Sequence, residues 1–141
     1  MRVSAAMLLL AGCASGPLPP DDRTLAAGTW GGENAGVIVS DATVHVHLGC
    51  TVGDFPGPVS LDAGGRFTAA GAYVLQAFPV QQGPRLPAQF SGRVRRGILT
   101  LAIAVQDTVA GRLVALGPVS VALGRTPELG PCPICARGRK E

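Results

Sequence analysis

The stretch QFSGRVRRGILTLAIAVQ, residues 89–106, decides the fold. Before its Arg-Arg-Gly, apolar and polar residues alternate, so that Phe90 and Val94 share one face of an extended chain. After it, a second run with the same period of two brings leucine, isoleucine and valine side chains to one face. Two such runs separated by a short glycine-containing turn at 95–97 predict a pair of antiparallel strands.

Similar runs extend in both directions along the chain and are separated by turn-forming sequences. The other turns are SDA at 40–42, DAGG at 62–65 and DTVAG at 107–111. The first predicted strand opens at Gly28, and the others cover residues 37–39, 43–52, 58–62, 66–78, 88–96, 98–106 and 112–124. Because short turns join strands that are neighbours in sequence, the simplest topology is an antiparallel meander.

About seven or eight strands in one domain must close on themselves, because an open sheet would leave one face and two edges in water. The sequence therefore predicts an all-β domain over residues 28–124, either a small antiparallel up-and-down barrel or a closed sandwich. The last two predicted strands, 98–106 and 112–124, are apolar on both faces. We expect such strands to be covered on both sides or to meet a partner on one.

Composition agrees with this fold class and excludes one class of partner. The 141 residues suffice for one domain and include 20 glycines and 12 prolines but only 15% charged residues, a mixture that suits short strands and tight turns. The net charge of +3 arises at the two ends, because eight basic and eight acidic residues balance between Cys13 and Cys135. Between these two cysteines only Arg93, Arg95 and Arg96 cluster in sequence, so we expect no nucleic-acid partner.

The N-terminus has the order of an export signal. A positive start, MR, precedes an apolar run over residues 3–10 that is too short to span a bilayer. The following Leu10-Ala11-Gly12-Cys13 resembles the bacterial lipobox at all four positions. The resemblance implies that residues 1–12 are removed as a lipoprotein signal peptide and that Cys13 carries the anchoring lipid. The alternative is an ordinary signal peptide cut nearby, which leaves an unmodified Cys13.

The residues after Cys13 indicate the membrane to which the lipoprotein is sent and the link between its lipid and the barrel. Ala14, rather than aspartate, follows Cys13. In lipoproteins of bacteria with two membranes, this implies transfer to the outer membrane, with the domain facing the periplasm. Residues 13–27 are rich in proline, serine and aspartate without an apolar period, so we expect a flexible tether between lipid and barrel.

Two further resemblances concern the barrel. Gly28-Thr29-Trp30 is similar to the G-x-W motif that opens lipocalin and avidin-type barrels. More broadly, GTWGG, LDAGGRFTAAGAY, FSGRV and LTLAI, with a cysteine near the C-terminus, resemble a family of small uncharacterised lipocalin-like bacterial envelope proteins over residues 28–135. The likeness implies a lipocalin-like fold and brings no activity with it.

Three cysteines remain once Cys13 is assigned to lipid, and an oxidising envelope favours a disulfide between two of them. Cys50 has the inward parity of its predicted strand, while Cys132 and Cys135 lie in the predicted tail, residues 125–141. These positions leave the partner of Cys50 open. The family resemblance favours Cys132, because the family carries its cysteine early in this tail.

Two chemical alternatives use the same tail. Cys132 and Cys135 have the C-x-x-C spacing of a redox dithiol, but the helix that activates such thiols is missing from the pattern. The same pair has zinc-ligand spacing, and His45 with His47 would complete the set, although both histidines face away from Cys50. We therefore expect no catalytic residues, no cofactor and no metal.

The remaining candidate site residues are aspartates and aromatic residues. Asp54, Asp62 and Asp107 fall at predicted turns, where a carboxylate caps its own backbone. Inward-facing aromatic side chains form either a ligand pocket or a core, and the size of the barrel favours a packed core. These residues are Trp30, Phe67, Tyr73 and Phe90.

The predicted function is that of an outer-membrane-anchored lipoprotein with a non-catalytic binding or envelope-structural domain. Its partners would be the membrane, through the N-terminal lipid, and a periplasmic protein or small hydrophobic ligand. The alternatives are a lipocalin-like carrier of such a ligand, an inhibitor of a hydrolase, and a thiol oxidoreductase that uses Cys132 and Cys135. The oligomeric state stays open.

Overall fold

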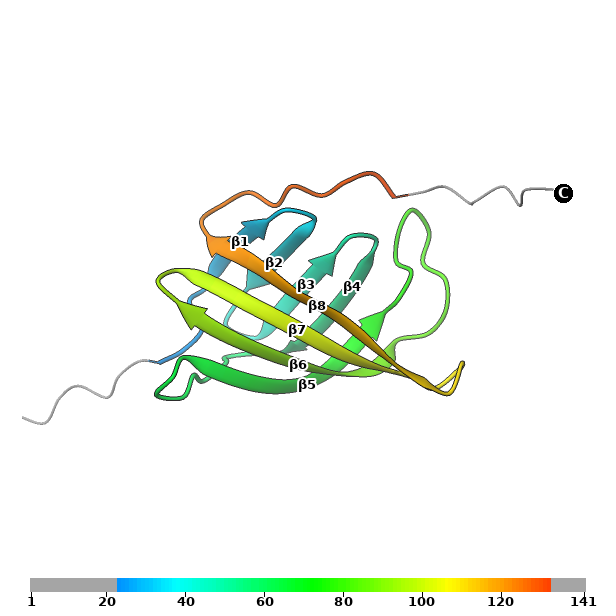
Figure 1. Ribbon diagram of the computed structural model, residues 1–141, viewed down its shortest axis with the longest axis horizontal. Coiled ribbons are helices and arrows are strands. Elements are labelled where there is room, and N and C mark those ends of the chain that lie inside the picture. The colour runs from blue at the N-terminus through cyan, green and yellow to red at the C-terminus, as the bar shows by residue number, and fades with distance from the viewer. Residues whose placement is uncertain (1–22, 133–141) are drawn as a thin grey trace, which may run out of the picture.

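Eight antiparallel strands follow one another around a closed barrel in the computed structural model, which describes residues 23–132 (Figure 1). Each strand pairs with the next one in the chain, and the last returns to pair with the first. The strands are β1 (Gly28–Gly32), β2 (Ala35–Val39), β3 (Thr43–Leu48), β4 (Thr51–Pro56), β5 (Arg66–Val74), β6 (Leu86–Arg95), β7 (Ile98–Asp107) and β8 (Arg112–Leu123). The predicted all-β, antiparallel up-and-down barrel is confirmed.

The period of two seen in the sequence reappears as alternating burial along the strands. In β6 and β7, every second side chain enters the interior, from Leu86 to Phe90 and from Leu99 to Val105. The largest fully buried side chains are Trp30, Tyr73, Phe90, Leu99, Leu101, Ile103, Val37, Val44, Val46, Val74, Val105 and Val121. One apolar core therefore runs through the barrel.

A bulge in β8 explains why its sequence is apolar on both faces. The β7–β8 register shifts between Leu101 and Ile103, where Gly117 adopts a φ of +83°. Val114 and Leu116 before the bulge, and Val119 and Val121 after it, all pack on the core, although they lie at opposite parities. These four residues therefore need no cover on the outer face, because the inward face changes parity along the strand; contact of an apolar outer face with a partner stays a prediction.

Other apolar side chains on the outside of the two last strands stay uncovered. Ile98 is 41% exposed, Leu113 is 70% exposed and Leu123 is 44% exposed.

All regular elements within residues 23–132 are strands, and none of this part of the chain forms a helix long and apolar enough to cross a membrane.

Three predicted strands differ from the structure by more than two residues. Residues 43–52 do not form one strand, because Gly49, with a φ of +55°, and Cys50 form the turn between β3 and β4. Cys50 therefore lies in a turn and not on an inward strand face. Residues 58–62 cross one end of the barrel instead of forming a strand, and β5 ends at Val74 rather than at 78.

The chain before β1 closes that end of the barrel. The backbone of Leu25 donates a hydrogen bond to the carbonyl of Val59 at 2.9 Å, and both side chains are buried. Beside them, Trp30 Nε1 donates to the carbonyl of Ala26 at 3.0 Å. Residues 23–27, predicted as part of a tether, therefore belong to the packed unit.

The chain after β8 also packs on the barrel. Residues 125–132, here named the strap, run across β1 and β2 at the top of Figure 1. The backbone of Glu128 donates to the carbonyl of Gly32 at 3.0 Å and accepts from the backbone of Asn34 at 2.8 Å. A Cβ atom on Gly31 would lie 2.2 Å from the carbonyl oxygen of Arg125, so only glycine lets the strap lie this close.

Candidate functional site

The four aromatic residues expected inside the barrel are all buried. Trp30, Tyr73 and Phe90 are at most 1% exposed, and Phe67 is 7% exposed. Phe55, which the sequence reading missed, joins them with its ring centroid 4.5 Å from that of Phe90 and 5.8 Å from that of Phe67. Aromatic side chains from β4, β5 and β6 thus meet in the middle of the interior.

Inward-facing glycines are covered by aromatic rings from the neighbouring strand. Gly53 lies opposite Tyr73, and a Cβ atom on this glycine would come within 2.1 Å of the tyrosine ring. Gly92 lies opposite Phe67, where the corresponding distance is 2.2 Å. The rings thus occupy the space that the glycines leave, which favours a packed interior over a ligand cavity at these positions.

The interior also contains a polar contact. The hydroxyl of Tyr73 and Thr51 Oγ1 lie 2.7 Å apart, and Thr51 Oγ1 in turn donates to the carbonyl of Leu48 at 2.7 Å. Burial, partly offset by the hydrogen bond with Thr51, raises the pKa of Tyr73 to about 12. This chain of hydrogen bonds gives the one tyrosine a polar partner at the rim of the core.

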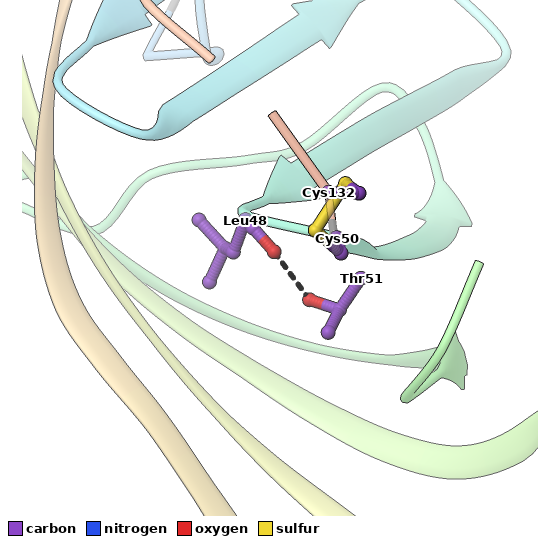
Figure 2. Close-up of a disulfide and its surroundings, with 4 residues drawn as sticks. All are labelled: Leu48, Cys50, Thr51 and Cys132. Atoms are coloured by element: carbon purple, nitrogen blue, oxygen red, sulfur yellow. Dashed lines mark hydrogen bonds between the residues drawn. A yellow bond between two sulfur atoms is a disulfide. The ribbon is translucent and has the colours of Figure 1, made fainter. Parts of the chain in front are cut away.

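A disulfide joins Cys50 to Cys132 across 82 residues of sequence, with the two Cα atoms 5.5 Å apart. Figure 2 shows that the bond ties the end of the strap to the turn between β3 and β4. The carbonyl of Cys50 also accepts backbone hydrogen bonds from Ala77 at 2.9 Å and Phe78 at 3.3 Å. One turn therefore holds both the strap and the segment that follows β5.

The disulfide confirms the pairing that the family resemblance favoured. Cys13 and Cys135, the proposed lipid carrier and the second cysteine of the C-x-x-C sequence, lie outside the described residues.

A cluster of charged side chains lies on the outer surface of β3 and β4. His45 Nδ1 lies 2.6 Å from Asp54 Oδ1, and Arg85 Nη2 donates to Asp54 Oδ2 at 3.0 Å. Partial burial opposes ionisation of Asp54, but the hydrogen bonds from His45 and Arg85 outweigh it and hold the pKa of this carboxyl below its ordinary value. The carboxylate thus orients the imidazole and is itself held by the guanidinium.

The sequence analysis did not predict this cluster, because it placed Asp54 at a turn. It lies within β4, directly opposite His45. Recognising the glycine of LGCT, residues 48–51, as a hairpin turn would have paired the two residues. The turn roles expected for Asp62 and Asp107 are confirmed, since each carboxylate accepts two backbone N–H groups of its own turn.

His47, the other histidine of the zinc alternative, has a different environment. Its ring stacks on that of Phe78, with centroids 4.9 Å apart. Partial burial and, to a smaller extent, the proximity of His45 lower the pKa of His47 below its ordinary value. Cys132 is committed to the disulfide, and the described residues contain no group of three or more histidine, cysteine, aspartate or glutamate side chains placed to hold a metal. Among the described members of the proposed zinc set, Cys132 is therefore not available as a ligand.

A depression of about 450 Å³ lies between the β1–β2 turn, the β3–β4 turn and β8. The lining residues are Glu33, Asn34, Leu48, Gly49, Thr51, Leu116, Gly117 and Val119. This hollow is lined by both polar and apolar residues and is open to solvent.

The chain matches no protein-family model, no curated protein and no solved structure.

Proposed function

We propose that the protein is a lipid-anchored, non-catalytic module of the bacterial envelope that binds through its outer surface. The observation that carries the proposal is the filling of the barrel interior by aromatic rings lying over glycines, as at Phe67 and Gly92. A carrier of a small hydrophobic molecule needs an internal cavity in which most of the ligand surface is buried. A barrel filled in this way favours recognition on its exterior.

The cysteine arrangement supports the non-catalytic part of the proposal. Redox catalysis by the C-x-x-C pair requires Cys132 and Cys135 to form and break a bond with each other. In the structure Cys132 is bonded instead to Cys50, where it fastens the strap to the barrel. Such a long-range bond is typical of structural disulfides in proteins of an oxidising compartment.

The lipobox resemblance supports the anchor, and mass spectrometry tests it. Protein extracted from membranes is expected to begin at Cys13 and to carry the mass of attached acyl chains. An unmodified Cys13, or a chain cut at another residue, would refute the anchor.

Native mass spectrometry tests the packed interior. The purified protein is expected to have the mass of the polypeptide and its lipid alone. A small apolar molecule that co-purifies, and that is lost when Gly92→Val pushes the Phe67 ring further inward, would establish the carrier alternative instead.

Thiol counting tests the cysteine assignment. In a Cys13→Ser chain that is denatured without reductant, we expect one reactive thiol, at Cys135. A reversible bond confined to Cys132 and Cys135 would establish the oxidoreductase alternative.

A further inference from the structure

Arginine side chains gather at one end of the barrel, which we name the basic end. It comprises Arg23, Arg66, Arg93, Arg95 and Arg96. β5 begins and β6 ends there, beside the start of the described chain, at the lower left of Figure 1. A shallow depression of about 400 Å³ lies among them, lined by Arg23, Leu61, Asp62, Ala63, Gly64, Gly65, Arg93, Val94, Arg95 and Arg96.

The arrangement places like charges next to one another. Arg66 lies directly opposite Arg93 in the β5–β6 ladder, a pairing of like charges that is ordinarily destabilising. Arg95 is two residues beyond Arg93 and on the same face of β6. Arg95, together with partial desolvation and Arg66, lowers the pKa of Arg93 below its ordinary value. An anion placed between these side chains would relieve their repulsion.

Asp62 is the one acidic residue among the described residues that line the depression. Its Oδ1 accepts backbone N–H groups from Gly64 and Arg66, both at 2.8 Å, so this carboxylate shapes the turn. Arg93, Arg95 and Arg96 against this aspartate leave the described lining of the depression positive.

The basic end is also the end nearest the proposed anchor. Arg23 stands ten residues after Cys13 in the sequence. A chain of that length spans at most about 35 Å when fully extended. A lipid on Cys13 would therefore keep the basic end within a short distance of the bilayer, where anionic headgroups concentrate.

Resting on the proposed lipid anchor, we propose that the basic end docks on the phosphate groups of anionic lipids in the leaflet that holds the acyl chains of Cys13. Guanidinium groups bind phosphate oxygens through paired N–H donors, which suits Arg93 and Arg95 at the rim of the depression. Docking would place the basic end against the membrane. The opposite end of the barrel, where β3 turns into β4, would face away from it.

The test is binding of the chain that begins at residue 13 and carries Cys13→Ser to phosphatidylcholine vesicles with and without phosphatidylglycerol. Dividing the affinity for vesicles with phosphatidylglycerol by the affinity for vesicles without it removes the contribution of contacts that both kinds of vesicle allow. Arg93→Gln combined with Arg95→Gln is expected to lower this ratio roughly tenfold to thirtyfold. The matched control, Arg85→Gln with Arg112→Gln, removes the same charge away from the basic end and should keep the ratio within about threefold of the parent. Added salt should weaken the preference for the anionic vesicles.

Three results would overturn the inference. One is a parent chain without preference for phosphatidylglycerol, and another is an equal loss in the two double variants. The third is a combination of two observations: inorganic phosphate binds saturably at Arg93 in NMR titrations, and the preference for anionic vesicles does not depend on Arg93 and Arg95. That combination would assign the basic end to a soluble anion. Because the vesicle assay uses an unlipidated chain, its outcome is separate from the mass measurement at Cys13, and either proposal can fail alone.

Discussion

Gly92 lies directly opposite Phe67 in the β5–β6 ladder, and the phenyl ring occupies the space in which a side chain at residue 92 would stand. The same relationship recurs between Gly53 and Tyr73 on the neighbouring pair of strands. Glycines on the inner face of this barrel therefore make room for large rings. They determine where the aromatic core can form.

Replacing Gly92 tests this relationship. In Gly92→Ala, the new methyl group would meet the Phe67 ring at 2.2 Å, so the ring must move and the core must repack. We expect the free energy of unfolding to fall by about 1–3 kcal/mol in urea titrations. The control is Gly130→Ala in the strap, where the nearest atom would be 3.9 Å away. Equal stability of the two variants would contradict the packing described for Gly92.

Tyr73 provides a spectroscopic test, because it is the one tyrosine of the chain. Absorbance titration of tyrosinate should give a pKa of about 12 instead of the ordinary 10.0. Since the folded-state pKa is the higher one, the stabilisation from neutral Tyr73 is complete below pH 10 and is lost as pH rises towards 12. Thr51→Val removes a hydrogen bond that lowers this pKa, so the variant should titrate still higher; a lower value would show that Thr51 does not hold the tyrosine hydroxyl.

Asp54 predicts a dependence on acid. Its pKa lies below 3.8 in the folded protein, so the unfolded chain takes up the proton first. The stabilisation from the carboxylate is therefore present above pH 3.8 and is lost as pH falls through the lowered value. Asp54→Asn should lose about 0.5–1 kcal/mol of stability near neutral pH and less at the acidic end of a denaturation series.

The control for Asp54 is Asp41→Asn, which removes a carboxylate from the exposed turn between β2 and β3. A pH profile of Asp54→Asn parallel to that of the parent, or matched by Asp41→Asn, would mean that the pairs with His45 and Arg85 contribute no stability.

The disulfide predicts three equal effects. Cys50→Ala, Cys132→Ala and the double variant each lose the same bond, so each should lose the same stability, up to about 4.5 kcal/mol for a loop of this length. Chemical denaturation with intact-mass analysis measures both stability and bonding. A Cys132→Ala chain that keeps parental stability through a bond between Cys50 and Cys135 would show that the strap accepts either cysteine.

Long strands with polar turns were predictable from sequence. The hairpin of β6 and β7 has alternation over many residues and a turn containing Gly97, whose φ is +75°. The β3–β4 hairpin lacked such a signal, because Thr51 and Val52 continue the apolar and β-branched character of β3 through the turn. A short hairpin without polar turn residues reads as one longer strand.

The surface sites were less predictable, because they depend on which strands are neighbours. His45 and Asp54 become partners through the missed hairpin. Arg66 and Arg93 lie 27 positions apart in the chain, and only the β5–β6 register brings them opposite each other. The strap depends on the absence of a side chain at Gly31, which sequence alone does not distinguish from a glycine that merely permits a turn.

The bond between Cys50 and Cys132 makes residues 50–132 a covalent ring that contains β4 to β8, to which β1, β2 and β3 are attached as a branch. A single backbone cut inside the ring, such as one in the exposed segment 78–85, opens the ring without releasing any strand. A cut in the turn at 40–42 would instead leave β1 and β2 held by non-covalent contacts alone. A barrel tethered through its N-terminus would thus stay in one piece after proteases nick its long outer loop.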